Sequence, residues 1–173
     1  MRLGKLVPLA MLAAALLCGP TPADGANFDK GDGWYKWSID GAMEMGSSCC
    51  YRLKGDSVSR QTCNLDSKHG TIISNSDCSE SSGKLTFYVR SKKGKPAIVR
   101  AFDSNCPVST EEAVTDLGPV SLARSDAMLL EIVRTTSLGM DVREDALFWL
   151  VQTGSDATFE YLDQLLSANG GAG

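Results

Sequence analysis

The sequence predicts an α+β fold, with a small antiparallel β unit cross-linked by disulfides and then an antiparallel helical segment. All cysteines after residue 25 lie before residue 107. Apolar residues alternate with polar ones in that half and recur at helical spacing after it. Residues 27–106 hold twelve Lys/Arg and nine Asp/Glu, whereas residues 107–173 hold three Arg and eleven Asp/Glu. Composition, period and charge therefore all change near the same position.

The 173 residues allow one compact domain, or two small units that share a core. We place the boundary at Pro107, which precedes a helix-start pattern. The expected parts are a cleaved signal peptide (1–25), a disulfide-linked β-rich domain (26–107), a helical segment (108–168) and a flexible tail (169–173).

The first 25 residues have the pattern of a secretory signal peptide. Arg2 and Lys5 precede a twelve-residue apolar run, Leu6 to Leu17, and small residues suited to cleavage follow. A membrane span needs about 20 apolar residues, so we expect no stable span after cleavage, a retained anchor being the alternative. Cys18 lacks the preceding small residue of a lipoprotein signal, and we assign it to the discarded peptide. The expected location is the periplasm or the extracellular space, where disulfides form.

The β-rich part is expected to contain short strands joined by turns. The clearest hairpin alternates Leu85, Phe87 and Val89 with more polar residues before a turn at 92–95. Residues 64–84 are rich in Ser, Asn, Asp and Gly and are expected to be mostly loop. The expected strands are 34–39, 49–54, 58–64, 85–91 and 97–102.

Five cysteines follow the expected signal peptide, which predicts two disulfides and one free thiol. A three-residue loop at 55–57 would place Cys49 opposite Cys63 in a hairpin. Cys78 and Cys106 lie just beyond the open end of the 85–102 hairpin. The favoured pairs are therefore Cys49–Cys63 and Cys78–Cys106, which leaves Cys50 available for a homodimer. An exchange of Cys49 and Cys50 remains open.

Metal and redox chemistry are the competing interpretations of these cysteines. A metal site would use them together with His69, but zinc sites usually bring ligands in closely spaced pairs, and no C-x₂-C occurs. The missing C-x-x-C also argues against thiol redox chemistry. We therefore expect no metal and no cofactor.

No catalytic motif is recognisable, and the formal net charge of −4 argues against nucleic-acid binding. We accordingly expect a protein that is not an enzyme. The alternative is a small hydrolase whose carboxylates converge in a cleft between the β and helical halves, since such pairs meet only in space.

Residues 109–117 are expected to form a short helical turn, because Ser109 and Glu112 have the spacing of a capping box. Three helices should follow, each bounded by a cap or a glycine. The first covers about 121–136, the second runs from a cap at Asp141 to Gly154, and the third covers 155–166.

The segment from Asp141 to Leu150, followed by Gly154 to Ala157 and by Leu162, Leu165 and Leu166, resembles part of a HEAT repeat. The resemblance covers about residues 139–166 and implies helices stacked as in an α-solenoid, an arrangement commonly used for protein binding. No catalytic residue is carried over. Solenoids need about three or more stacked repeats. The apolar helix faces must therefore be covered by the β part, a second copy or a partner.

Two groups of side chains are candidates for partner contact. Phe148 and Trp149 are adjacent aromatic residues, of which we expect at least one in the core, the alternative being an exposed anchor for a partner. The turn lysines Lys92, Lys93 and Lys95 are expected to be a solvated hairpin tip, or a contact for an anionic surface. The sequence thus predicts an exported, non-catalytic binding protein whose partner is another protein.

Overall fold

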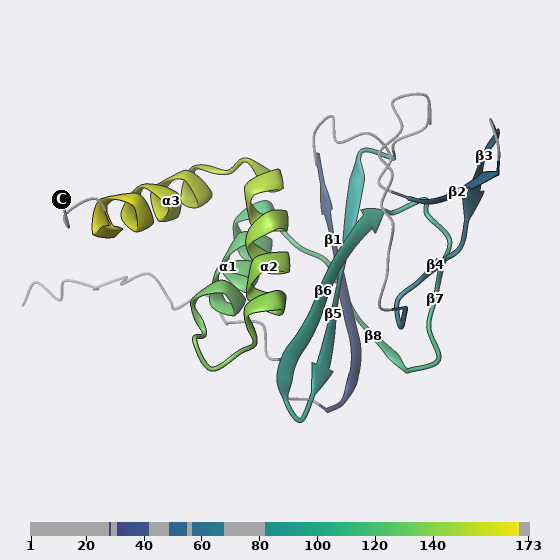
Figure 1. The fold of residues 1–173 in the computed structure, drawn as a ribbon, viewed down its shortest axis with the longest axis horizontal. Helices are drawn as coiled ribbons and strands as arrows, with labels where there is room; N and C mark the ends of the chain where they lie inside the picture. The colour runs from purple at the N-terminus through teal and green to yellow at the C-terminus, as the bar shows by residue number, and fades with distance from the viewer. Residues whose placement is uncertain (1–27, 29–30, 42–48, 55–56, 68–81, 170–173) are drawn as a thin grey trace, which may run out of the picture.

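The structure is a computed structural model in which three helices lie on one side of a mixed β-sheet (Figure 1). It describes residues 28, 31–41, 49–54, 57–67 and 82–169. The strands are β1 (Gly33–Asp40), β2 (Cys50–Lys54), β3 (Ser57–Gln61), β4 (Cys63–Asn64), β5 (Lys84–Lys92), β6 (Lys95–Asp103), β7 (Val108–Ser109) and β8 (Val114–Pro119). The helices are α1 (Leu122–Arg134), α2 (Met140–Thr153) and α3 (Asp156–Asn169).

The main sheet has four strands in the order β6–β5–β1–β8. The expected hairpin is present, with Leu85 opposite Asp103 and Lys92 opposite Lys95. Lys93 and Gly94 form its turn with positive φ values of 54° and 70°, as a two-residue hairpin turn requires. The α+β class is confirmed. The unit is not purely antiparallel, because β8 pairs with β1 in the parallel direction.

Residues 108–119 add strands to the β unit, so the helical turn expected at 109–117 is wrong. The Glu111 N–H donates to the Asp66 carboxylate at 2.8 Å, and the Glu112 N–H donates to Thr110 Oγ1 at 3.1 Å. These donors are bonded without a helix, and the apparent capping box of Ser109 and Glu112 is not used. The β unit therefore ends at Pro119, twelve residues after the expected boundary.

The sheet and the helices share one hydrophobic core. Trp37 lies at its centre, 1% exposed, with its ring stacked on Phe87 at 5.2 Å between centroids. Its indole N–H donates to Ser125 Oγ of α1 at 2.9 Å. Buried residues of β1, β5 and β6 meet those of α1 and α2 in one cluster. The two halves are therefore not independent folding units.

A second, smaller core covers the other face of the sheet. Trp34 and Phe102 project from β1 and β6 on that side, and Leu65 packs against them. Buried cysteines complete this cluster, so cross-links replace part of the apolar area that a larger core would provide.

The disulfides join Cys49 to Cys106 and Cys50 to Cys63, with Cα–Cα distances of 5.4 Å and 5.3 Å. The favoured pairs Cys49–Cys63 and Cys78–Cys106 are therefore wrong. Cys50 is not free for a homodimer, and Cys78 lies outside the described residues.

The physical reason for the different pairing is the register of the first hairpin. Lys54 pairs with Ser57, so the loop has two residues instead of three. Cys50 consequently pairs with Gln61, and Cys63 lies beyond the end of β3, opposite no residue of β2. Cys63 belongs instead to β4, which pairs with β7, and from there it bonds Cys50 while Cys49 bonds Cys106.

The helix ends follow local signals. Ser121 caps α1 by accepting from the Arg124 N–H at 3.3 Å, and Ser155 accepts from the Thr158 N–H at 3.3 Å at the start of α3. Gly154 ends α2 in the left-handed region with φ of 62°. Asp141 does not cap α2 but lies in its first turn, after Gly139. Within the described residues, no helix combines the length and the apolar character that crossing a bilayer requires.

Candidate functional site

The adjacent aromatic residues of α2 have different environments. Trp149 is 5% exposed, and its ring meets Phe87 of β5 edge-on at 6.4 Å. Phe148 is 54% exposed and contacts the Trp149 ring from outside at 5.1 Å. The expectation that at least one of the two lies in the core is confirmed for Trp149. Trp149 is not available as a partner contact, which leaves Phe148 as the candidate anchor.

Exposed large apolar side chains concentrate on the helices. Seven of the nine such residues in the described part belong to α1, α2 or α3, and the other two belong to β8. The seven are Leu122, Met140, Phe148, Val151, Phe159, Leu165 and Leu166. Scattered apolar residues are ordinary on a surface, and their concentration on consecutive helices makes these helices the candidate site.

Helix α3 is the least covered of the three. It runs from the end of α2 away from the sheet (Figure 1). Thr158 is its one buried residue among positions 156–167, and its hydroxyl donates to the Leu150 carbonyl at 3.1 Å. The Tyr161 ring lies 5.1 Å from the Arg134 guanidinium of α1. Phe159 and Leu166 remain 59% and 72% exposed.

Acidic side chains accompany these apolar residues. Asp141, Glu144 and Asp145 lie seven, four and three positions before Phe148, which places all three on its side of α2. Partial burial raises the pKa of Asp145 above its ordinary 3.8, and the cation of Arg100 opposes that shift. The exposed side of α2 is therefore both apolar and negatively charged.

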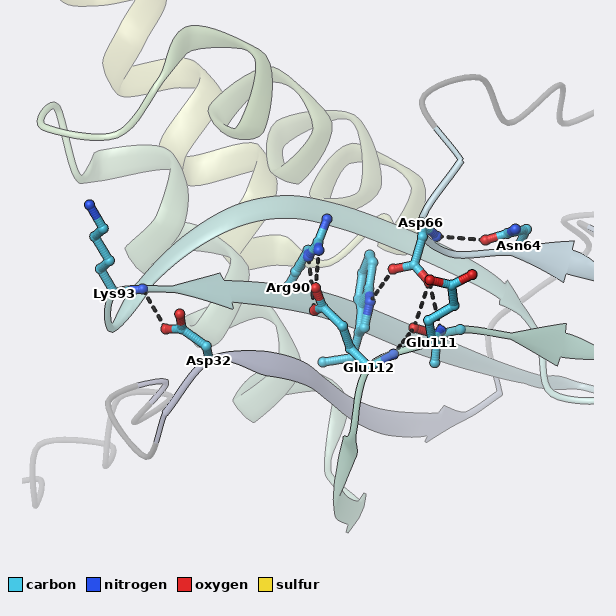
Figure 2. Close-up of polar contacts among 9 residues, drawn as sticks. Asp32, Asn64, Asp66, Arg90, Lys93, Glu111 and Glu112 are labelled. Carbon is cyan, nitrogen blue, oxygen red and sulfur yellow. Dashed lines mark hydrogen bonds and ion pairs between the residues drawn. The ribbon is translucent and has the colours of Figure 1, made fainter.

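The basic turn is smaller than the sequence indicated. Lys92, Lys93 and Lys95 are exposed, as expected. Arg90, however, forms an ion pair with Glu112, with Nε 3.0 Å from Oε2 (Figure 2). Arg100 is held by a hydrogen bond to the Ser67 carbonyl. Three lysines at a hairpin tip remain, which fits the solvated-tip interpretation better than an anion site.

No sequence pattern indicates the polar cluster around Asp66, which joins the end of β4 and the segment between β7 and β8 to Trp34 of β1 (Figure 2). The Asp66 carboxylate accepts from the Trp34 indole N–H at 3.1 Å, from the Thr110 hydroxyl at 2.9 Å and from the Glu111 N–H at 2.8 Å. These bonds, with that of Glu111 the largest cause, lower the pKa of Asp66 below its ordinary 3.8. Its donors are 32 to 45 residues away, so no local pattern could reveal the cluster. We interpret it as structural.

We predict that Asp66→Asn lowers the free energy of unfolding by about 1 kcal/mol at pH 7, because a charged acceptor is lost from a partly exposed site. A carboxyl whose pKa is lowered by folding stabilises the protein above its unfolded pKa, and this stabilisation is lost as pH falls through the folded pKa. The wild type should therefore lose more stability than the variant between about pH 5 and pH 3. Urea unfolding at both pH values measures this.

Asp40→Asn is the matched control, since it removes the same charge from an exposed ion pair with Lys84. Its effect at pH 7 should stay within about 0.5 kcal/mol. Equal effects of the two substitutions at pH 7 would show that the bonds of Asp66 do not stabilise the fold.

A cavity of about 160 Å³ lies between the β and helical halves. Its charged lining residues are Lys95 and Glu131, and Phe28, Ile132 and Leu138 make it largely apolar. The alternative hydrolase needs two carboxylates in such a cleft, whereas the described lining provides one. This cavity therefore gives that alternative no support.

The cysteines and acidic residues do not form a metal centre in the described part of the chain, where no three potential ligands converge. Cys49, Cys50, Cys63 and Cys106 are consumed in disulfides and have no thiolate to offer a metal. His69 lies outside the described residues.

The candidate site is therefore the exposed side of α2 and α3. The sequence periodicity predicted apolar faces on these helices, but not which side chains stay exposed. Comparison with protein-family models, with curated proteins and with solved structures finds no match to this chain.

Proposed function

We propose that this chain is an exported, non-catalytic binding protein whose protein partner docks on the exposed side of α2 and α3. The observation that carries the proposal is the concentration of exposed apolar side chains on these helices, with Phe148 and Phe159 more than half exposed. Aromatic side chains of this kind supply most of the binding energy in many interfaces.

The cross-linked β unit supplies a rigid base for that surface. Trp149 and Trp37 fix α2 and α1 against the sheet, while Phe148 next to Trp149 points outward. A preorganised anchor loses little entropy on binding, which favours affinity. The proposal therefore assigns the sheet a supporting role and the helices the contact.

Export is part of the proposal. Two intramolecular disulfides and the absence of a membrane-crossing helix in the described residues are compatible with a protein of an oxidising compartment. The signal-peptide pattern of residues 1–25 supports a periplasmic or extracellular location. The HEAT-like character of residues 139–166 belongs to the proposal as well, and the two consecutive helices α2 and α3 in this range support it.

Site-specific photo-crosslinking tests this function. We predict that p-benzoylphenylalanine at position 148 or 159 forms a covalent adduct with a partner protein when the chain is expressed in its own host. The same group at Gln164 of α3 or Thr115 of β8 should give none, although both positions are exposed. Adducts are detected as mass shifts on denaturing gels and identified by mass spectrometry.

The pattern across positions is the informative result. Adducts at all four positions in equal yield would indicate random encounters, and no adduct at 148 or 159 would contradict the proposed function. An adduct in which the chain is linked to itself would indicate a homo-oligomer.

A further inference from the structure

Helix α3 is mostly exposed, although a helix of its length depends on packing for its stability. It spans 14 residues, and nine of the twelve residues at 156–167 are exposed. Isolated helices shorter than about 12–15 residues are marginal in water, and most helices depend on tertiary packing of an apolar face. The packing that α3 receives from α1 and α2 is limited to the side of Thr158 and Tyr161. A further contact would complete it.

The uncovered part of α3 is a stripe and not a scattered set. Phe159, Leu162 and Leu166 occur at i, i+3 and i+7, which places them on one face of the helix. Phe159 and Leu166 are exposed, and Leu162 is half-buried between them. Anchors at this spacing are the pattern by which one amphipathic helix packs along another.

The charge of α3 identifies the kind of helix that would fit. Asp156 and Asp163 lie three positions before and four positions after Phe159, and Glu160 follows it directly. The helix contains no Lys or Arg. Val151 and Phe148 at the end of α2 are likewise preceded by acidic residues. A basic partner is therefore complementary along the whole stripe.

A second copy of this chain fits the stripe less well. In a two-fold interface the same surface meets itself, so three carboxylates of α3 would face three carboxylates of the other copy. Like charges placed together across an interface disfavour association.

Resting on the proposed function, we propose that α3 binds a basic amphipathic helix of the partner, with apolar residues at i, i+3/i+4 and i+7 and Lys or Arg on the flank that faces the carboxylates of α3. The partner's apolar residues cover Phe159, Leu162 and Leu166, and its cations pair with Asp156 and Asp163.

Three synthetic peptides of about 18 residues test this with the exported chain. The first carries Leu at i, i+3/i+4 and i+7 with Lys flanks, the second has Glu in place of Lys, and the third is a scrambled form of the first. Fluorescence anisotropy should show the first peptide binding at least about tenfold more tightly than either of the others. Hydrogen exchange at residues 156–167 should slow only with the first peptide.

Variants of exposed α3 residues separate the apolar and charged contributions. Phe159→Asp or Leu166→Asp should abolish binding of the basic peptide. Asp156→Asn combined with Asp163→Asn should weaken it about tenfold and bring the affinities of the Lys and Glu peptides together. Gln164→Ala, on the other side of the helix, is the matched control and should change nothing. Near-ultraviolet circular dichroism checks that each variant retains the folded core.

Equal binding of the scrambled peptide, or a preference for the Glu peptide, would overturn this inference. A dimer that Phe159→Asp dissociates, detected by sedimentation, would identify a second copy as the occupant instead. If the photo-crosslinks at 148 and 159 form while no peptide preference is found, the proposed function stands and the basic-helix inference fails. If those crosslinks are absent, the proposed function itself fails.

Discussion

Replacing Cys49 and Cys106 with alanine is expected to lower the free energy of unfolding by about 4 kcal/mol, a large part of the stability of a small protein. The two cysteines are 57 residues apart, so their disulfide removes much chain entropy from the unfolded state. The Cys50–Cys63 disulfide closes a separation of 13 residues, and its removal should cost about 3 kcal/mol. Urea unfolding of the wild type and both variants measures the difference.

The two variants also test the assignment of the disulfides by peptide mapping. Cys49 and Cys50 are adjacent, so no protease separates them, and a digest of the wild type links three peptides together. The variant without Cys50 and Cys63 should yield one linked pair that contains Cys49 and Cys106. A link between any other cysteines in that variant, or an equal stability loss in both variants, would contradict the assignment of the bonds.

The fold was largely predictable where local pattern and tertiary packing agree. The alternation of Leu85, Phe87 and Val89 and the glycines that bound α2 match the structure, because each reports a periodicity or a turn that the local sequence determines. The segment around Glu111 and Glu112 was not predictable. Its helix-start pattern is overridden by Asp66 and by strand pairing, which depend on contacts distant in sequence.

Of the candidate site, the sequence could predict the residue types but not their exposure. The sequence pattern does not say whether Phe148 or Trp149 is buried. The position of the sheet determines this, and Trp149 is the residue that faces it. The spacing of Phe159 and Leu166 similarly predicts a face that packs in the core. Both residues are exposed because α3 runs away from the sheet after α2 (Figure 1). The cysteine pairing was not predictable either, because Cys63 leaves the first hairpin for β4, whose pairing with β7 is a contact distant in sequence.

The aromatic pair provides the second large effect. We predict that Trp149→Ala lowers the free energy of unfolding by about 3–5 kcal/mol, because the large side chain leaves a cavity between α2 and the sheet. Trp149 is 5% exposed and contacts Phe87, which in turn stacks on Trp37. The loss should appear in urea unfolding as a lower midpoint.

Phe148→Ala is the matched control, since it removes an aromatic ring one residue away on the same helix. The Phe148 ring is 54% exposed, so its loss should cost less than about 1 kcal/mol, while photo-crosslinking at position 159 should weaken if the two positions share a partner. Stability and binding are thus expected to separate between adjacent residues, with Trp149 holding α2 on the sheet and Phe148 contacting the partner. Similar stability losses for both variants would mean that Phe148 belongs to the core, and the helical surface would then lose its central anchor.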